Sequence, residues 1–276
     1  MGMFYNCSNL LTINASNFNT SNVESLRIFL YNCQKLISID MSNFDTSNLI
    51  NMEGMFFNCS SLTYIDVSHF NTYFINLFCG CSNLISVDLS NFDTSSTISL
   101  ERLFQNCYSL LSIDVSNFNT TNAISMKGLF YDCGKITSLN LSNFDTSKVT
   151  DMGYLFCGCV NLTSIELSNF NTTNVISMRS LFYKCGKLTY LNLSNFDTSK
   201  VTDMQYFFFG CTNLTSIDIS NFNTQNIKSL KSFFNLCENL VSIDLSFFET
   251  SKITDFSFLF YRCKKLKSIN LLDINT

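Results

Sequence analysis

Apolar and polar residues alternate over short stretches that recur along the chain. Among the apolar residues Leu84, Val87 and Leu89, the last two alternate with Ser86 and Asp88. A period of two puts successive side chains on opposite faces of a β-strand. Each copy of this pattern therefore predicts one short strand with an apolar face and a polar face.

The second half of each copy has a helical spacing. After one strand and its turn, apolar residues follow at steps of three, three, one and three, as one face of a helix requires: Val149, Met152, Leu155, Phe156 and Cys159. Asp145, Thr146 and Ser147 come directly before, and these residue types cap helix N-termini. Asn or Gly often precedes the repeat cysteine and tolerates the left-handed conformation that closes a helix. Each copy thus predicts strand, turn, short helix and turn.

Cysteine marks the repeat. Successive repeat cysteines are 26 residues apart, except for one step of 22: Cys7, Cys33, Cys59, Cys81, Cys107, Cys133, Cys159, Cys185, Cys211, Cys237 and Cys263. A unit with one strand and one helix cannot bury its apolar face alone, but stacked units can. We therefore predict an α/β solenoid of leucine-rich-repeat type with about 11 rungs. Its parallel β-sheet is expected on the concave face and its short helices on the convex face, over roughly 50 Å.

No linker or change of composition interrupts the repeats, so residues 1–276 are predicted to form a single repeat domain. The chain begins and stops inside a copy, and we expect a fragment that lacks both caps. The copy from Cys59 to Cys81 lacks four residues, about one helical turn. We predict a shortened or irregular convex segment at Asn71 to Phe78, with the strand Tyr64 to Ser68 in register.

The pattern carries a family resemblance. A sequence close to L-F-x-x-C-x-x-L-x-x-I-D-L-S-N-F-D-T-S-x-V-x-x-M runs from Leu129 to Met152 and recurs over essentially the whole chain. It resembles the BspA-like leucine-rich-repeat surface proteins of bacteria and parasitic protists, including the 26-residue repeats of mycoplasma surface proteins. The resemblance implies a secreted or cell-surface protein that adheres to host or matrix molecules and has no enzymatic activity.

The chain departs from the ordinary leucine-rich repeat, L-x-x-L-x-L-x-x-N-x-L, at one position. Phenylalanine stands where the ladder asparagine would lie, for example at Phe18, Phe44, Phe92 and Phe144. We expect an aromatic spine to replace the asparagine ladder.

Thirteen cysteines leave three alternatives: disulfides, a metal site or free thiols. The repeat cysteines share one inward position beside Leu or Phe, where free cysteine behaves as a small hydrophobic residue. In a parallel stack their Cβ atoms stay about 4.8 Å apart, whereas a disulfide needs roughly 3.8 Å. We predict a buried ladder of reduced thiols. The other two, Cys79 and Cys157, lie three copies apart and cannot share one metal.

One polar column is expected to point outward from the middle of the strands: Asn14, Asp40, Asp66, Asp88, Asp114, Asn140, Glu166, Asn192, Asp218, Asp244 and Asn270. It forms either a site for cations or a basic partner, or only a solvated sheet face. Arg27 and Lys35 are the only positively charged residues among the first hundred, with histidine counted as neutral. A partner site is therefore predicted in the N-terminal half, at Asp40, Asp66, Asp88, Asp114, Ser38, Ser42, Ser86, Ser90 and Ser112.

A second polar column alternates between Asn and an acid: Asn19, Asp45, Asn71, Asp93, Asn119, Asp145, Asn171, Asp197, Asn223, Glu249 and Asn275. Both types cap helices well, and alternation keeps the carboxylates about two rungs apart, where repulsion is mostly screened. We assign this column to stability.

Aromatic residues two positions before the repeat cysteine define an aromatic ridge: Tyr5, Tyr31, Phe57, Tyr131, Tyr183, Phe209 and Tyr261. Exposed apolar patches often mark partner sites. The ridge is an alternative contact surface, at Tyr31, Phe57, Tyr131, Tyr183, Phe209 and Tyr261, unless its rings only pack against one another between rungs.

Composition excludes several functions. The 17 Lys and Arg against 21 Asp and Glu form no long basic run, so nucleic-acid binding is not expected. Nowhere do 18 apolar residues follow one another, so no membrane span is predicted. The chain has one histidine, and every notable acid belongs to a repeated column, whereas an active site is a unique constellation. We expect no enzyme, no cofactor and no metal.

Two functions remain. The first is a surface adhesion module, extracellular or at the cell surface, that binds a protein or glycoprotein; no signal peptide is present in this chain. The second is an intracellular, cytoplasmic scaffold that binds proteins, favoured by unpaired cysteines.

Overall fold

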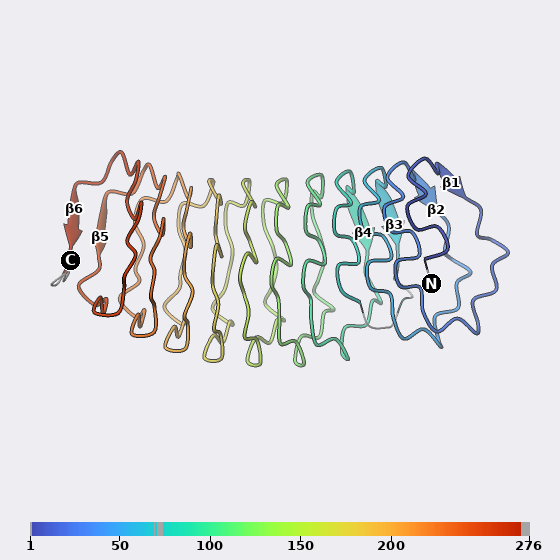
Figure 1. The fold of residues 1–276 in the computed structure, drawn as a ribbon, viewed down its shortest axis with the longest axis horizontal. Coiled ribbons are helices and arrows are strands. Elements are labelled where there is room, and N and C mark those ends of the chain that lie inside the picture. Colours follow the sequence, from blue (N-terminus) through green and yellow to red (C-terminus); the bar gives the residue numbers. More distant parts are fainter. Residues whose placement is uncertain (1, 69, 71–73, 272–276) are drawn as a thin grey trace.

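A computed structural model describes residues 2–68, 70 and 74–271. Successive repeats lie side by side as rungs along the long axis of the molecule, from the N-terminal to the C-terminal end (Figure 1). Short parallel strands pair between neighbouring rungs: β1 (Thr12–Ile13) with β2 (Ser38–Ile39), β3 (Tyr64–Asp66) with β4 (Ser86–Asp88), and β5 (Ser242–Asp244) with β6 (Ser268–Asn270). The predicted repeat solenoid is thus present.

The predicted helices are wrong. Residues 2–68, 70 and 74–271 contain no helix, and the segment 149–159 is a ribbon of tight turns. Backbone N–H groups there alternate between two kinds of acceptor. Leu155 and Cys157 donate three residues back, to Met152 at 3.2 Å and to Tyr154 at 3.1 Å. The N–H groups of Met152, Tyr154 and Phe156 instead donate to the next rung, to the carbonyls of Ser177, Arg179 and Leu181.

Positive φ angles explain why a helix cannot form. Each rung has two such residues, one and five positions before the repeat cysteine; Tyr154 has φ 61° and Gly158 has φ 75°. An α-helix needs negative φ throughout. The turn ribbon still puts apolar residues at the helical spacing into the core, so the spacing alone does not distinguish the two structures.

The expected N-caps close turns instead of helices. Asp145 accepts the backbone N–H of Ser147 at 2.9 Å, with no helix following. Most of the described rungs have three corners of this kind, at which a side-chain oxygen accepts the N–H two residues on. In one rung the pairs are Asn140 with Ser142, Asp145 with Ser147, and Asp151 with Gly153. The second polar column therefore stabilises turns; its members Asn71 and Asn275 lie outside the described residues.

The core is a set of stacked columns of identical side chains. Phenylalanine rings lie over one another, for example Phe104 over Phe130 at 6.0 Å between centroids and Phe130 over Phe156 at 6.3 Å. All thirteen cysteines are free, and the repeat cysteines from Cys33 to Cys237 are buried. Each of these thiols donates to a carbonyl of the preceding rung, as Cys159 does to Phe130 at 3.2 Å. The structure thus confirms that these repeat cysteines form a buried ladder of free thiols, as predicted.

An asparagine ladder accompanies the aromatic spine, so the expected replacement is wrong. The spine is present, since Phe118 stacks on Phe144 at 6.3 Å. The residue before it, Asn143, donates its side-chain amide to the carbonyl oxygens of Phe118 at 2.7 Å and Val115 at 3.1 Å in the preceding rung. The ladder is displaced by one residue rather than lost.

A threonine ladder was not predicted. The Thr172 hydroxyl donates to the carbonyl of Asp197 at 2.9 Å and accepts the N–H of the same residue at 2.8 Å. Thr94, Thr120, Thr146 and Thr198 bond the next rung in the same way. These buried hydroxyls provide hydrogen-bond partners for backbone N–H and C=O groups that are not paired in a β-sheet.

The shortened copy keeps its register. Tyr64 pairs with Ser86, and Asp66 with Asp88, as predicted. Phe70 and Phe74 are four positions apart, whereas Phe44 and the equivalent Met52 are eight apart, so the deletion falls between them. Of the segment predicted to be irregular, residues 71–73 lie outside the described residues. From Phe74 onward the turns are regular, because Cys79 donates to Asn76 and Cys81 to Phe78 as in other rungs.

Candidate functional site

The first polar column, from Asn14 to Asn270, is called the acidic column below. It lies on the strand face, meaning the outward side chains of β1 to β6 and of the equivalent segments between them. Its carboxylates are fixed because each closes a corner of its rung. Asp88 accepts the N–H of Ser90 at 2.9 Å, and Asp114 accepts that of Ser116 at 2.9 Å. Asparagines in the column, such as Asn140 with Ser142 at 3.2 Å, make the same bond. The charge of an aspartate is therefore not needed for the turn.

These hydrogen bonds stabilise the charged form of the acids. The N–H and hydroxyl of Ser42 hold the pKa of Asp40 below its usual value, and Ser116 does the same for the pKa of Asp114. Burial, followed by the charges of Asp66 and Asp88, raises the pKa of Tyr64. The part of the strand face around Tyr64 is thus electronegative near neutral pH.

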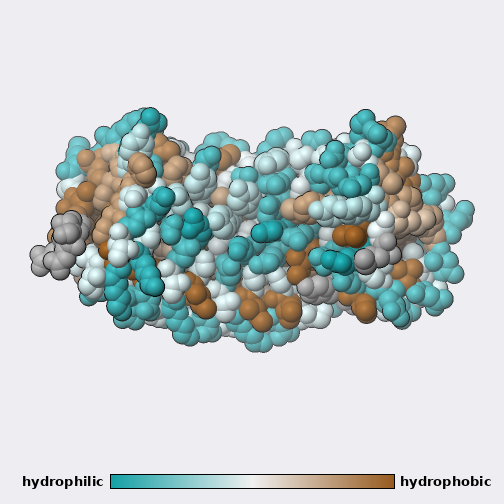
Figure 2. Space-filling model, in the orientation of Figure 1, coloured by the Kyte–Doolittle hydropathy of each residue, from teal (hydrophilic) through white to brown (hydrophobic). Residues whose placement is uncertain are grey.

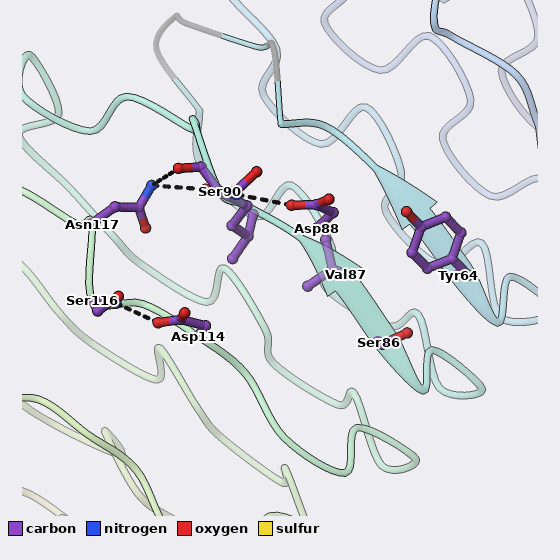
Figure 3. Close-up of a pocket in the computed structure, with 9 residues that line it drawn as sticks. Tyr64, Ser86, Val87, Asp88, Ser90, Asp114, Ser116 and Asn117 are labelled. Carbon is purple, nitrogen blue, oxygen red and sulfur yellow. Dashed lines mark hydrogen bonds between the residues drawn. The ribbon is translucent and has the colours of Figure 1, made fainter.

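A hollow of about 360 Å³ lies in this region. Of the predicted partner residues it brings together Asp88, Asp114, Ser86 and Ser90 (Figure 3). It does not include Asp40, Asp66, Ser38, Ser42 or Ser112 in its lining, although Asp66 pairs in register with Asp88. Asn117 closes one side by donating to the carbonyls of Leu89 at 2.7 Å and Ser90 at 3.3 Å.

The sequence reasoning missed the tyrosine beside this hollow. Tyr64 stands on β3, next to Asp88 on β4, and is 53% exposed (Figure 3). A second hollow of about 320 Å³ has the same arrangement, with Tyr190 beside Asn192 and Asp218. Both tyrosines occupy the first strand position, where most copies have serine. The replacement of serine by tyrosine at this position is the feature of the sequence that could have indicated the two hollows.

The aromatic ridge is partly a stacked wall. Tyr31 lies on Phe57 with centroids 4.4 Å apart, and Tyr183 lies on Phe209 at 4.6 Å. Tyr261 is 49% exposed and has Arg262 over its ring at 5.3 Å. Tyr131 and Tyr183 line a separate hollow. On the face seen in Figure 2, hydrophobic residues are interspersed with hydrophilic ones along the array.

A protein family matches the whole chain. It is described as "Mycoplasma protein of unknown function, DUF285", and it matches residues 1–77, 72–191 and 177–276. The chain belongs to this family. The mycoplasma part of the resemblance found in the repeats is therefore confirmed, at the level of the family.

Solved structures of similar shape are more distant from this DUF285 protein. A leucine-rich cell surface protein from Faecalibacterium prausnitzii is 16% identical, with 99% of this chain and 76% of that one covered, at a TM-score of 0.45. A leucine-rich repeat protein from Bacteroides ovatus is 19% identical, with 97% and 76% covered, at 0.43. An internalin from Listeria monocytogenes is 15% identical, with 99% and 71% covered, at 0.32. No curated protein matches the DUF285 chain.

The described part of the chain shows neither a membrane-spanning helix nor a cluster of metal ligands. Among the described residues, no helix has the length and apolarity needed to cross a bilayer. Within the same residues, no three His, Cys, Asp or Glu side chains converge as metal ligands would.

Proposed function

We propose that this DUF285 chain is a non-enzymatic module that binds a protein or glycoprotein, and that the strand face around Tyr64, Asp88 and Asp114 receives a basic segment of that partner. One observation carries the proposal: an exposed tyrosine borders a hollow lined by carboxylates that the fold holds in place. Preorganised charges steer an oppositely charged partner and fix its register.

The distribution of charge supports the position. The first hundred residues contain two positively charged residues and seven acids: Arg27 and Lys35 against Glu24, Asp40, Asp45, Glu53, Asp66, Asp88 and Asp93. The C-terminal end instead has Arg262, Lys264, Lys265 and Lys267. A basic segment is therefore attracted to the N-terminal half more strongly than to the rest of the array.

The test removes charge without disturbing the fold. Asp66→Asn with Asp88→Asn keeps a side-chain oxygen for each turn, as the natural Asn14 and Asn140 do. Binding of a fluorescent oligolysine peptide is measured by anisotropy at several salt concentrations. We expect a loss of about 2- to 30-fold, because exposed charge pairs contribute about 0.2–1 kcal/mol each, and a flatter salt dependence.

Glu166→Gln with Asp244→Asn is the matched control, since it changes net charge equally at two members of the same column that line neither the Tyr64 hollow nor the Tyr190 hollow. Equal losses in the two double variants would show attraction to the whole molecule and would refute the site. Unchanged affinity in the first variant, together with a loss in Tyr131→Ser with Tyr183→Ser, would move the site to the aromatic ridge.

We place the module at the cell surface, as an adhesion protein, on the strength of the repeat resemblance. The alternative is a cytoplasmic binding scaffold, and the thirteen free thiols favour it because a reducing compartment maintains them. Labelling intact cells with a reagent that cannot cross membranes separates the two: labelled chain supports the surface, and label that appears only after lysis supports the scaffold.

A further inference from the structure

Two adjoining hollows lie beside the aromatic ridge, with volumes of about 370 and 360 Å³. They share Tyr131 and Tyr154 in their walls. Their other aromatic and charged lining residues are Tyr183, Tyr206, Arg102, Lys127 and Arg179. The described lining thus has three cations and no carboxylate, in a chain whose net charge is −4.

The arginine in the hollow of about 370 Å³ is held rigidly. Arg179 donates from Nε to the Tyr154 hydroxyl at 2.9 Å and from Nη1 to Gln205 at 3.0 Å and Asp203 at 3.4 Å. Its guanidinium lies 5.1 Å from the centroid of the Tyr206 ring. A guanidinium fixed in this way loses little entropy when it binds a further anion.

The carboxylates that pair with these cations also accept backbone N–H groups in turns of their own rungs. Asp203 accepts the N–H of Gln205 at 3.0 Å, while its other oxygen faces Arg179. Asp151 lies 3.6 Å from the Lys127 ammonium and accepts the N–H of Gly153 at 2.8 Å. The anions are tied to the backbone and the cations border the hollows, which favours a negatively charged ligand.

Two tyrosines of this site occupy strained backbone positions. Tyr154 and Tyr206 have φ of 61° and 62°, where Gly54 and Gly128 stand in other rungs. A bulky side chain in the left-handed region costs of the order of 1 kcal/mol or more, as it also does at Ile28 and Phe258 in other rungs. Both rings remain partly exposed, so core burial does not offset that cost.

We infer that the ridge hollows bind an acidic, extended peptide segment of a partner protein, with its carboxylates on Arg102, Lys127 and Arg179 and its other side chains against the tyrosine rings. Tyrosine and arginine dominate protein-binding hot spots, and arginine pairs with carboxylates in two-point geometry. The three cations come from rungs one and two steps apart, so they span about 14 Å, the length of four to five extended residues.

The probe is a labelled ten-residue polyglutamate peptide, and anisotropy reports its binding to the full chain at low salt. Arg102→Gln with Arg179→Gln should lower affinity about tenfold. Lys265→Gln with Lys267→Gln removes the same charge from exposed positions elsewhere and should change affinity less than twofold. Asp66→Asn with Asp88→Asn should not weaken this binding, which separates it from the proposed strand-face function.

Tyr154→Gly separates binding from folding. Glycine fits φ 61° without strain, so this variant should be no less stable than the parent, yet it should bind the peptide at least threefold more weakly because Arg179 loses its hydroxyl partner. Full affinity in Tyr154→Gly, equal losses in both charge variants, or no binding by the parent chain would each overturn the inference. Tighter binding of a heparin-derived hexasaccharide at the same residues would replace the peptide by a glycan.

Discussion

Replacing Thr172 by valine tests whether the threonine ladder holds neighbouring rungs together. Valine has the same shape and the same β-branching, so the change removes only the hydroxyl. That hydroxyl is buried, donates to the Asp197 carbonyl at 2.9 Å and accepts the Asp197 N–H at 2.8 Å. The variant leaves both backbone groups without this partner.

The expected cost follows from those two bonds. A buried backbone group that loses its partner costs about 1–3 kcal/mol. Burying a methyl group in place of the hydroxyl returns about 1 kcal/mol. For two such groups, we therefore expect Thr172→Val to lower the free energy of unfolding by about 1–5 kcal/mol.

Two measurements check this value. Urea unfolding followed by circular dichroism gives the free energy, and hydrogen exchange read by mass spectrometry reports the segment around Asp197. Because each rung contacts only its neighbours, the loss of protection should concentrate at that rung. Thr173→Val is the control: Thr173 is exposed and its hydroxyl donates only to the Asn171 side chain at 2.7 Å, so the change should cost under about 0.5 kcal/mol. A Thr172→Val cost no larger than the control, or unchanged exchange at Asp197, would refute the ladder as a stabilising element.

Three further predictions concern the thiol count, stability at alkaline pH and one turn. Thiol counting on denatured protein kept from air should find close to thirteen free groups, whereas the native chain should react first at exposed Cys7; several disulfides would contradict the ladder. Burial raises the pKa of Cys33 and Cys79 to about 11 and of Cys157 to about 12. Unfolded thiols ionise near 8.5, so stability should be full below that pH and fall above it by up to about 1.4 kcal/mol per pH unit for each buried thiol; a flat alkaline profile would contradict this. Gly158→Ala should cost about 1–3 kcal/mol in urea unfolding, since φ is +75° and a Cβ would collide with the Asp132 carboxylate, whereas Gly134→Ala, with ordinary contacts, should cost under about 1 kcal/mol.

Much of the fold was predictable from the sequence because the repeat is local and regular. The cysteine spacing predicts one rung per copy, and the apolar positions predict which side chains face inward. Parallel stacking follows, because identical units bury their apolar faces only against one another. The register of the shortened copy was also predictable, since Tyr64 and Ser86 hold the same place relative to their repeat cysteines.

The candidate sites were less predictable. The repeat pattern predicts the acidic column. Nothing in that pattern distinguishes Asp88 and Asp114, which line a hollow, from Asp40, which does not. Tyr64 lines this hollow together with shorter side chains of the next rung, such as Ser86 and Ser90. The role of Arg179 depends on Tyr154 and Asp203, which belong to neighbouring rungs 25 and 24 residues away.

The helix prediction failed for a related reason. The apolar spacing from Val149 to Cys159 fits a helix and a turn ribbon equally well, because both put the same side chains into the core. The choice depends on where the backbone N–H groups find acceptors. Those of Met152 and Tyr154 find carbonyls 25 residues ahead, in the next rung. The sequence by itself determined the period, the inward positions and the columns. Only the stacking of rungs decided the backbone between them, since alternate N–H groups of that backbone donate to the next rung.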